Sequence, residues 1–444
     1  MSDKKKLTLL GLFALAISGI SPTGAMAYST TATAKLAGYN VPLSFLLGGL
    51  GILCVAVCFA SMAKYVSDAG SAYAYIKRSF GEKGGFVTGW LLTFAYFALM
   101  ISQPGVVSNF FDVLLHHFNL HIPIGLLAFL IIFAFWLISL FGIKLTSKVA
   151  LCTESVSLLV LIILSAIILF KAGMSGSLSA KPLVPHHNFN GIGQGMIFAV
   201  LSYSGFEEVS TVSTRSNYHK KNIPKTLLWT VILMIIFFSV VTFVEVVGFG
   251  ITNVSAFANS SSPLDALSTK FLGNTMAIIM DLAIFLSGLA SILGSANACA
   301  YMLYALGKHH YLPKGFGKFN VKLNSPKNAV NFTAILGAVA YAIFGLPYGY
   351  NPIYTNASTL GVLSLLLVYM MVCLGSIVYF KKKNIHFSII RNLAIPIIGI
   401  AMLVLPLLSN IYPVPKFPAN LFPYMILLWV IIGFIIAHRH QNIN

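Results

Sequence analysis

The chain has 444 residues, of which 58% are hydrophobic and only 9% are charged, and its mean hydropathy is +0.87. Soluble domains carry about 25% charged residues, so this composition excludes a soluble globular protein. The apolar runs are about 20 residues or longer, which predicts membrane-spanning α-helices and not the short alternating strands of a barrel.

The hydrophobic runs predict twelve spanning helices, at residues 7–34, 41–66, 84–113, 121–141, 147–170, 190–214, 224–250, 275–306, 328–346, 353–380, 391–410 and 419–438. With the N-terminus inside, the outer segments hold five of the 28 basic residues, namely Lys35, Lys171, Lys181, Lys270 and Lys416. Because basic residues gather on the cytoplasmic side, this asymmetry predicts a cell-membrane protein with both termini in the cytoplasm. It also explains the net charge of +18 without nucleic acid as a partner.

The first run is interrupted by the sequence Ser18-Gly19-Ile20-Ser21-Pro22-Thr23-Gly24. The following Ala25-Met26-Ala27 has the form of a signal-peptide cleavage site. Cleavage there would leave eleven spans and place the new N-terminus outside, so we expect a retained helix. Pro22 lacks an N–H group and glycine weakens a helix, which predicts a break. Within hydrocarbon such a break is tolerated only inside protein or beside a water-filled cavity.

The sixth run contains a second candidate break at Ser204-Gly205, followed by the consecutive carboxylates Glu207 and Glu208. An ionised side chain at mid-membrane costs about 2.5–3.5 kcal/mol on insertion scales, so these residues are functional candidates. The alternative is that Gly205 only allows close helix packing and that one glutamate is paired or interfacial.

The first and sixth runs would each begin a set of five helices, one starting inside and the other outside. Interrupted helices at matching positions of inverted repeats indicate a transporter's binding site. The N–H groups and positive dipole end of a half-helix suit a carboxylate. We therefore predict a substrate site formed by Ser21, Thr23, Gly24, Ala25, Tyr203, Ser204, Gly205 and Phe206.

Other polar residues have a structural and a functional explanation. Gln103, before Pro104, marks a simple kink or faces the cavity. Asp281 is a candidate for the outer vestibule, and Glu245 is expected near the interface. Small polar residues of the eighth run allow helices to approach and bond across; they are Ser287, Ser291, Ser295 and Asn297.

The outer-loop histidines could bind a metal or sense pH, but solvated loop histidines are far commoner, so no metal site is predicted; they are His116, His117, His121, His186 and His187. No G-x-S-x-G, H-E-x-x-H, Walker A or C-x-x-C motif occurs. Neither an enzyme nor a cofactor is therefore predicted, and transport would use an ion or exchange gradient.

Four stretches, in order along residues 10–320, resemble the amino acid–polyamine–organocation (APC) superfamily of secondary transporters. They are Ile20-Ser21-Pro22-Thr23-Gly24-Ala25-Met26, Gly70-Ser71-Ala72-Tyr73-Ala74-Tyr75 with Gly85-Phe86-Val87-Thr88-Gly89-Trp90, Tyr203-Ser204-Gly205-Phe206-Glu207 with Lys221-Asn222-Ile223-Pro224-Lys225, and Tyr304-Ala305-Leu306 with Leu312-Pro313. The resemblance implies an all-α, LeuT-like fold of two inverted five-helix repeats, residues 1–172 and 186–383, with two further helices in 390–440.

The resemblance implies a secondary active transporter of an amino acid, with H⁺ or Na⁺ as coupling ion. A polyamine or amino acid–amine antiporter is the alternative within the family, and a non-transporting sensor or channel is the alternative of another class. Many proton-coupled relatives carry a lysine in the fifth helix, where this chain has Glu154. Glu207 matches the family's Gly-aromatic-Glu pattern, so we predict it to couple the proton, with Glu154 as its rival. Sodium-coupled members bind Na⁺ between the first and eighth helices, which makes Ser291 and Ser295 a possible ion site.

Overall fold

The computed structural model describes residues 8–66, 72–141, 143–185, 189–211, 219–323, 325–383 and 387–441. Gly70 and Ser71 of the second resembling stretch, and the loop histidines His186 and His187, lie outside these residues.

The described chain is built from helices. In chain order the α-helices are α1 (Leu9–Ile20), α2 (Pro22–Ala37), α3 (Val41–Ala63), α4 (Ala72–His116), α5 (Ile124–Leu140), α6 (Ile143–Met174), α7 (Phe189–Tyr203), α8 (Glu208–Thr211), α9 (His219–Phe249), α10 (Val254–Asn259), α11 (Pro263–Leu272), α12 (Asn274–Lys308), α13 (Lys327–Ala340), α14 (Leu346–Tyr348), α15 (Tyr350–Lys383), α16 (Ile395–Ser409) and α17 (Phe422–Gln441). Short 3₁₀ and π-helical turns join them, at η1 (Gly38–Asn40), η2 (Lys181–Leu183), η4 (Ile251–Asn253), η5 (Tyr341–Gly345), η6 (Ile390–Ala394) and η7 (Ala419–Leu421).

Nine helical segments of the described residues are long and apolar enough to cross a membrane, which agrees with an all-α membrane protein. The predicted count of twelve and the inverted repeat remain predictions. Leu9–Ala63 forms one apolar run of 55 residues that contains two predicted spans. Ile124–Leu140 and the 15-residue helix α7 are shorter than the roughly 20 residues that a full crossing needs.

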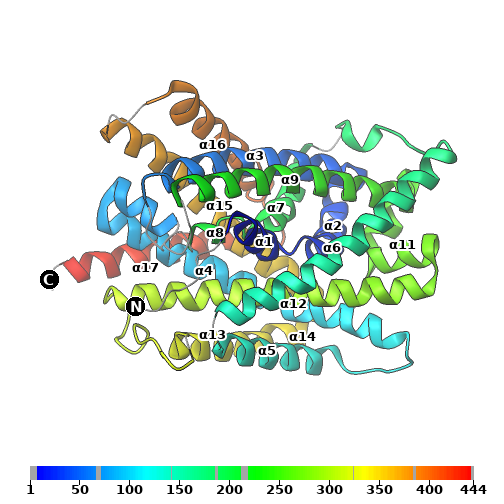
Figure 1. Cartoon of the computed structure of the whole chain (residues 1–444), viewed down its shortest axis with the longest axis horizontal. Helices are drawn as coiled ribbons and strands as arrows, with labels where there is room; N and C mark the ends of the chain where they lie inside the picture. The colour runs from blue at the N-terminus through cyan, green and yellow to red at the C-terminus, as the bar shows by residue number, and fades with distance from the viewer. Residues whose placement is uncertain are drawn as a thin grey trace.

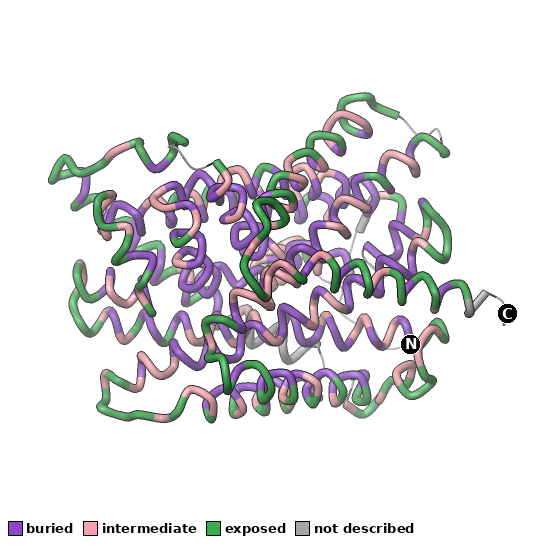
Figure 2. The backbone as a smooth tube through the Cα atoms, turned by 180° about the vertical axis from the view of Figure 1, so that it is seen from behind, coloured by how far each residue is buried: buried purple, intermediate pink, exposed green. Residues whose placement is uncertain are grey.

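The longest helices lie side by side, with α1, α7 and α8 between them at the centre (Figure 1). The helix α4 packs along α12 and α15, and α3 packs along α9. Buried residues gather in the middle of the molecule, and exposed residues lie mainly on the periphery (Figure 2). Many of the exposed side chains are apolar, such as Leu126, Leu130 and Phe133 of α5. An exposed apolar surface of this kind suits contact with lipid.

Both predicted helix breaks are present. The first lies between α1 and α2, at Ser21, and the second lies between α7 and α8. The two breaks meet directly: a Cβ atom added to Gly205 would lie 2.5 Å from the carbonyl oxygen of Gly19. Only a residue without a side chain permits this approach, because real Cβ atoms do not come so close to backbone. By contrast, α4 continues as a helix through Pro104, and its one non-helical residue is Gly81.

Candidate functional site

The break between α1 and α2 is made by Ser21, which adopts the left-handed conformation with φ 49° and ψ 61°. Its backbone N–H donates to the Ile17 carbonyl at 3.1 Å, and its hydroxyl donates to the Ser18 carbonyl at 2.9 Å. Pro22 then begins α2, a position where its missing N–H leaves no donor unpaired. The interruption therefore ends one helix and starts the next without an unsatisfied group at Ser21.

The first N–H groups of α2 point to protein side chains. Thr23 N–H donates to Glu154 Oε1 at 3.1 Å, and Gly24 N–H donates to Ser287 Oγ at 2.9 Å. Ala25 N–H bonds within the helix, to the Ser21 carbonyl at 3.0 Å. Ser287 Oγ in turn donates to Glu154 Oε2 at 2.5 Å. Two of these three N–H groups, which belong to the half-helix expected to suit a substrate carboxylate, are thus bonded to side chains of α6 and α12.

Glu154 is the carboxyl group at the centre of this arrangement. Its residue is 1% exposed, and the positive dipole end of α2 faces it. Among the described residues, no lysine, arginine or histidine forms an ion pair with Glu154. Within the described part of the chain, backbone and hydroxyl hydrogen bonds hold this carboxyl group and join three helices.

The second break runs from Ser204 to Glu207, with Gly205 at φ 102°. Gly205 N–H donates to Glu207 Oε2 at 3.1 Å, and the Tyr96 hydroxyl donates to Glu207 Oε1 at 3.3 Å. Glu207 is 2% exposed, and its hydrogen bond to Gly205 N–H closes its own turn. The Glu208 carboxylate instead lies between α1 and α12. A Cβ atom added to Gly19 of α1 would lie 2.9 Å from it, and one added to Gly294 of α12 would lie 3.5 Å from it.

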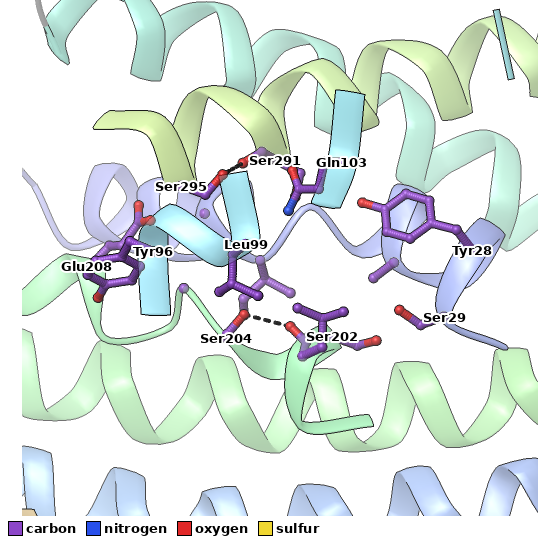
Figure 3. A pocket seen from close by; sticks show the side chains of 15 residues that line it. Tyr28, Ser29, Tyr96, Leu99, Gln103, Ser202, Ser204, Glu208, Ser291 and Ser295 are labelled. Carbon is purple, nitrogen blue, oxygen red and sulfur yellow. Dashed lines mark hydrogen bonds between the residues drawn. The ribbon is translucent and has the colours of Figure 1, made fainter. Parts of the chain in front are cut away.

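A cavity of about 40 Å³ lies where the breaks meet (Figure 3). Of the predicted site, Ala25, Ser204, Gly205, Ser291 and Ser295 line it. The rest of its lining is Gly19, Ile20, Tyr28, Ser29, Tyr96, Leu99, Gln103, Leu201, Ser202 and Glu208. A water needs roughly 10–15 Å³ by this kind of measure, so the cavity has room for about three waters. An amino acid requires it to expand.

The remaining predicted residues lie behind this lining. Tyr203 is fully buried, and its hydroxyl donates to the Phe45 carbonyl at 3.1 Å. Phe206 is also fully buried, edge-on to Phe59 with ring centroids 5.6 Å apart. Ser21, Thr23, Gly24, Glu154 and Glu207 do not line the cavity.

Gln103, expected either to mark a kink or to face the cavity, lines it. The sequence also contained a signal for Tyr28, Tyr96 and Leu99, which reasoning from the breaks missed. Tyr96, Leu99 and Gln103 follow one another at intervals of three and four residues, which places them on one face of α4. Tyr28 stands three residues after Ala25 on α2, again on one face. Figure 3 shows Tyr28 and Tyr96 at opposite ends of the cavity, with Leu99 between them.

The possible ion site at Ser291 and Ser295 is a pair of hydroxyls at the cavity. Ser295 Oγ donates to the carbonyls of Ser291 at 3.1 Å and Ile292 at 3.2 Å, which are bonds within its own helix. Glu245, expected near the interface, is fully buried, and its Oε1 accepts from the Thr30 hydroxyl at 3.3 Å.

Comparison with known proteins gives one consistent result. The family model described as amino acid permease matches residues 7–435. A branched-chain amino acid permease of Lactococcus lactis subsp. cremoris is 27% identical over 392 residues, which cover 83% of this chain and 80% of the relative. A branched-chain amino acid permease of Bacillus subtilis is 22% identical over an alignment that covers all of this chain and 95% of the relative. A methylthioribose transporter of Bacillus subtilis is 24% identical over 99% and 93%, respectively.

Proposed function

The chain belongs to the amino acid permease family, and from this premise we propose that it is a secondary active transporter that carries an amino acid by alternating access. The meeting of two interrupted helices beside a cavity carries the proposal. Gly19 and Gly205 bring the breaks into contact, and the lining offers hydroxyls, apolar side chains and the Glu208 carboxylate. Discontinuous helices facing a central site are the general architecture of such carriers.

Neutral branched-chain amino acids are the first substrates to test. Two similar proteins are named as permeases for them, and Ile20, Leu99 and Leu201 give the cavity apolar surface. None of the described residues that line the cavity is a lysine, arginine or histidine, which makes an acidic side chain an unfavourable substrate. Labelled leucine, isoleucine and valine should enter proteoliposomes, with glutamate and methylthioribose as comparison compounds. No accumulation of any of the three branched-chain substrates would contradict this assignment.

An amine or cationic amino acid is the second candidate, and the position of Glu208 favours it. The Glu208 carboxylate faces the cavity between α1 and α12 and could hold an ammonium group. Putrescine and arginine are therefore the necessary competitors in the uptake assay. Counterflow of labelled substrate separates a carrier from a sensor or channel, because only a carrier exchanges substrate one for one across the membrane.

We assign proton coupling to Glu154 before Glu207, which reverses the order expected from the family pattern. Glu207 bonds to its own turn and to Tyr96. Glu154 instead joins the start of α2 to α12 through Thr23 and Ser287. A proton on Glu154 would remove the negative charge and weaken its hold on the half-helix. Loading and release of that proton would then alter a contact between helices that move during transport.

The same contact offers a reason for cotransport of substrate and proton. The Thr23 and Gly24 N–H groups are the donors that a substrate carboxylate would use, and Glu154 and Ser287 occupy them. Protonation of Glu154 weakens this internal competitor, so the substrate carboxylate can take its place. Proton and substrate would then bind together, because each favours the state that the other needs.

We further propose the inverted repeats 1–172 and 186–383, the additional helices of 390–440, and cytoplasmic termini in the cell membrane. The unequal distribution of lysine and arginine supports this orientation. To test this orientation, single cysteines are placed near Lys181 and near Lys327 and are labelled in intact cells. The first should react with a membrane-impermeant reagent from outside, and the second should not.

A further inference from the structure

Three side chains from separate elements meet at one end of the helix bundle, where α11 lies against α12 (Figure 1). They are His117, directly after α4, Asp265 in the first turn of α11, and Asp281 in α12. We call them the His–Asp–Asp cluster. His117 Nε2 lies 3.1 Å from Asp281 Oδ2 and 3.5 Å from Asp265 Oδ1. His117 was expected to be a solvated loop histidine, yet its side chain is only 15% exposed.

The cluster has unsatisfied ligand atoms. The Asp281 side chain is fully buried, and its Oδ1 has no hydrogen-bond partner. Asp265 Oδ1 is also buried without a hydrogen bond. Among the described residues, no lysine or arginine forms an ion pair with either carboxylate. The fully buried Asp281 and the partly buried Asp265, whose side chain is 23% exposed, share one imidazole. This leaves the pair with too little positive charge nearby, which is costly in a protein interior.

We propose that the His–Asp–Asp cluster binds a divalent transition-metal ion, with Zn²⁺ as the probe. A tetrahedral zinc site with bonds of about 2.0–2.1 Å places its ligand atoms about 3.3–3.4 Å apart. The two separations from His117 Nε2, 3.1 and 3.5 Å, are already close to this value, and all three ligand atoms lie within 4.8 Å of one another. Two carboxylates and a neutral imidazole would balance the charge of the ion.

The donor set also selects the class of metal. Ca²⁺ takes six to eight oxygen ligands and Mg²⁺ prefers octahedral oxygen, whereas an imidazole with carboxylates suits zinc and its neighbours. A fourth position remains for water. The bound ion would join the ends of α4, α11 and α12, two of which also line the central cavity.

A second group nearby provides a matched control. Asp112, His116 and His121 also bring their ligand atoms within 4.8 Å, but His116 is 52% exposed and its Nε2 already faces Asp112 and His121 at 3.2 and 3.1 Å. Among the described residues, the buried polar atoms without a hydrogen-bond partner include none from Asp112, His116 or His121. The double variant His116→Ala/His121→Ala removes imidazoles from the same segment and leaves the His–Asp–Asp cluster intact.

The test is calorimetric titration of ZnCl₂ into the full-length protein in detergent, after chelator treatment and removal of any affinity tag. We expect one ion per chain, with affinity reduced by about tenfold or more in both His117→Ala and Asp281→Asn. The His116→Ala/His121→Ala control should keep wild-type affinity. If Asp281→Asn aggregates in size-exclusion chromatography, Asp265→Asn takes its place in the titration.

Three results would overturn the proposal: no zinc binding by the wild type, unchanged affinity in His117→Ala and the carboxylate variant, or loss of binding in the control alone. In the first case the cluster is a hydrogen-bonded ion pair without a metal. Because the readout is binding, it is independent of whether the protein transports an amino acid.

Discussion

The backbone N–H of Thr23 donates a 3.1 Å hydrogen bond to Oε1 of Glu154, 131 residues further along the chain. A carboxylate of the protein therefore occupies the half-helix start where an amino acid's own carboxylate would be expected. Ser287 completes the contact by bonding to both Gly24 N–H and Glu154 Oε2. This three-helix junction links a titratable group directly to the start of α2.

Replacement of Glu154 by glutamine should remove the pH dependence of uptake. Glutamine retains an oxygen that can accept from Thr23 N–H, but it cannot gain or lose a proton. We expect uptake by Glu154→Gln to be similar at acidic and neutral pH, and Glu207→Gln to keep the wild-type profile. The measurement is initial uptake rate against external pH in proteoliposomes. If Glu207→Gln alone loses the dependence, the proton belongs to the sixth run, as the family pattern indicated.

Methyl-esterification of the substrate should weaken binding by at least about tenfold, because hydrogen bonds to a charged group contribute about 1.5–3 kcal/mol. Only the free acid has the anion that can replace Glu154 at Thr23 and Gly24. Competition with labelled substrate measures the affinity of the ester. Equal affinity of ester and acid would exclude the half-helix as carboxylate site and make an amine-only substrate the better assignment.

Gly205→Ala should destabilise the protein and abolish transport. Its φ of 102° costs a side chain about 1–3 kcal/mol, and the added Cβ would lie 2.5 Å from the Gly19 carbonyl oxygen. Gly273→Ala is the matched control, since Gly273 has φ 88° but no atom within 4 Å of an added Cβ. Thermal unfolding midpoints and uptake rates compare the two variants. Similar behaviour in both would show that the close contact of the breaks is not required.

Glu208→Gln should raise the KM for a transported amino acid by about tenfold, the loss expected for one charge-assisted hydrogen bond to the substrate ammonium. The Glu208 carboxylate lines the cavity, whereas Glu207 lies behind its own turn. Glu207→Gln therefore serves as the neighbouring control and should affect unfolding more than KM. An unchanged KM in Glu208→Gln would remove this residue from the substrate site.

Replacement of Na⁺ by choline should leave uptake unchanged. The proposed coupling group is Glu154, which lies at the junction of α2 and α12 and takes up a proton and not Na⁺. Uptake at a fixed proton gradient, with and without Na⁺, is the measurement. Loss of uptake without Na⁺ would favour the Ser291 and Ser295 ion site over proton coupling.

The sequence alone determined the membrane class and the positions of both helix breaks, because these depend on local chemistry. Long apolar runs must form helices in lipid. Pro22 and Gly205 interrupt their helices through local backbone effects, which do not depend on how these helices pack. Residue spacing also predicts that Tyr96, Leu99 and Gln103 share one face of α4, but it does not show which helices this face contacts.

Only the tertiary structure decided which groups meet at these breaks. Glu207 and Glu208 are adjacent in sequence, yet one closes a turn and the other faces the cavity, because Glu207 belongs to the irregular turn of the second break and Glu208 begins α8. Glu154, Thr23 and Ser287 lie in three different hydrophobic runs, as do the members of the His–Asp–Asp cluster in three separate elements. Their contacts depend on how far each helix is rotated and shifted against its neighbours, which no local pattern in the sequence specifies.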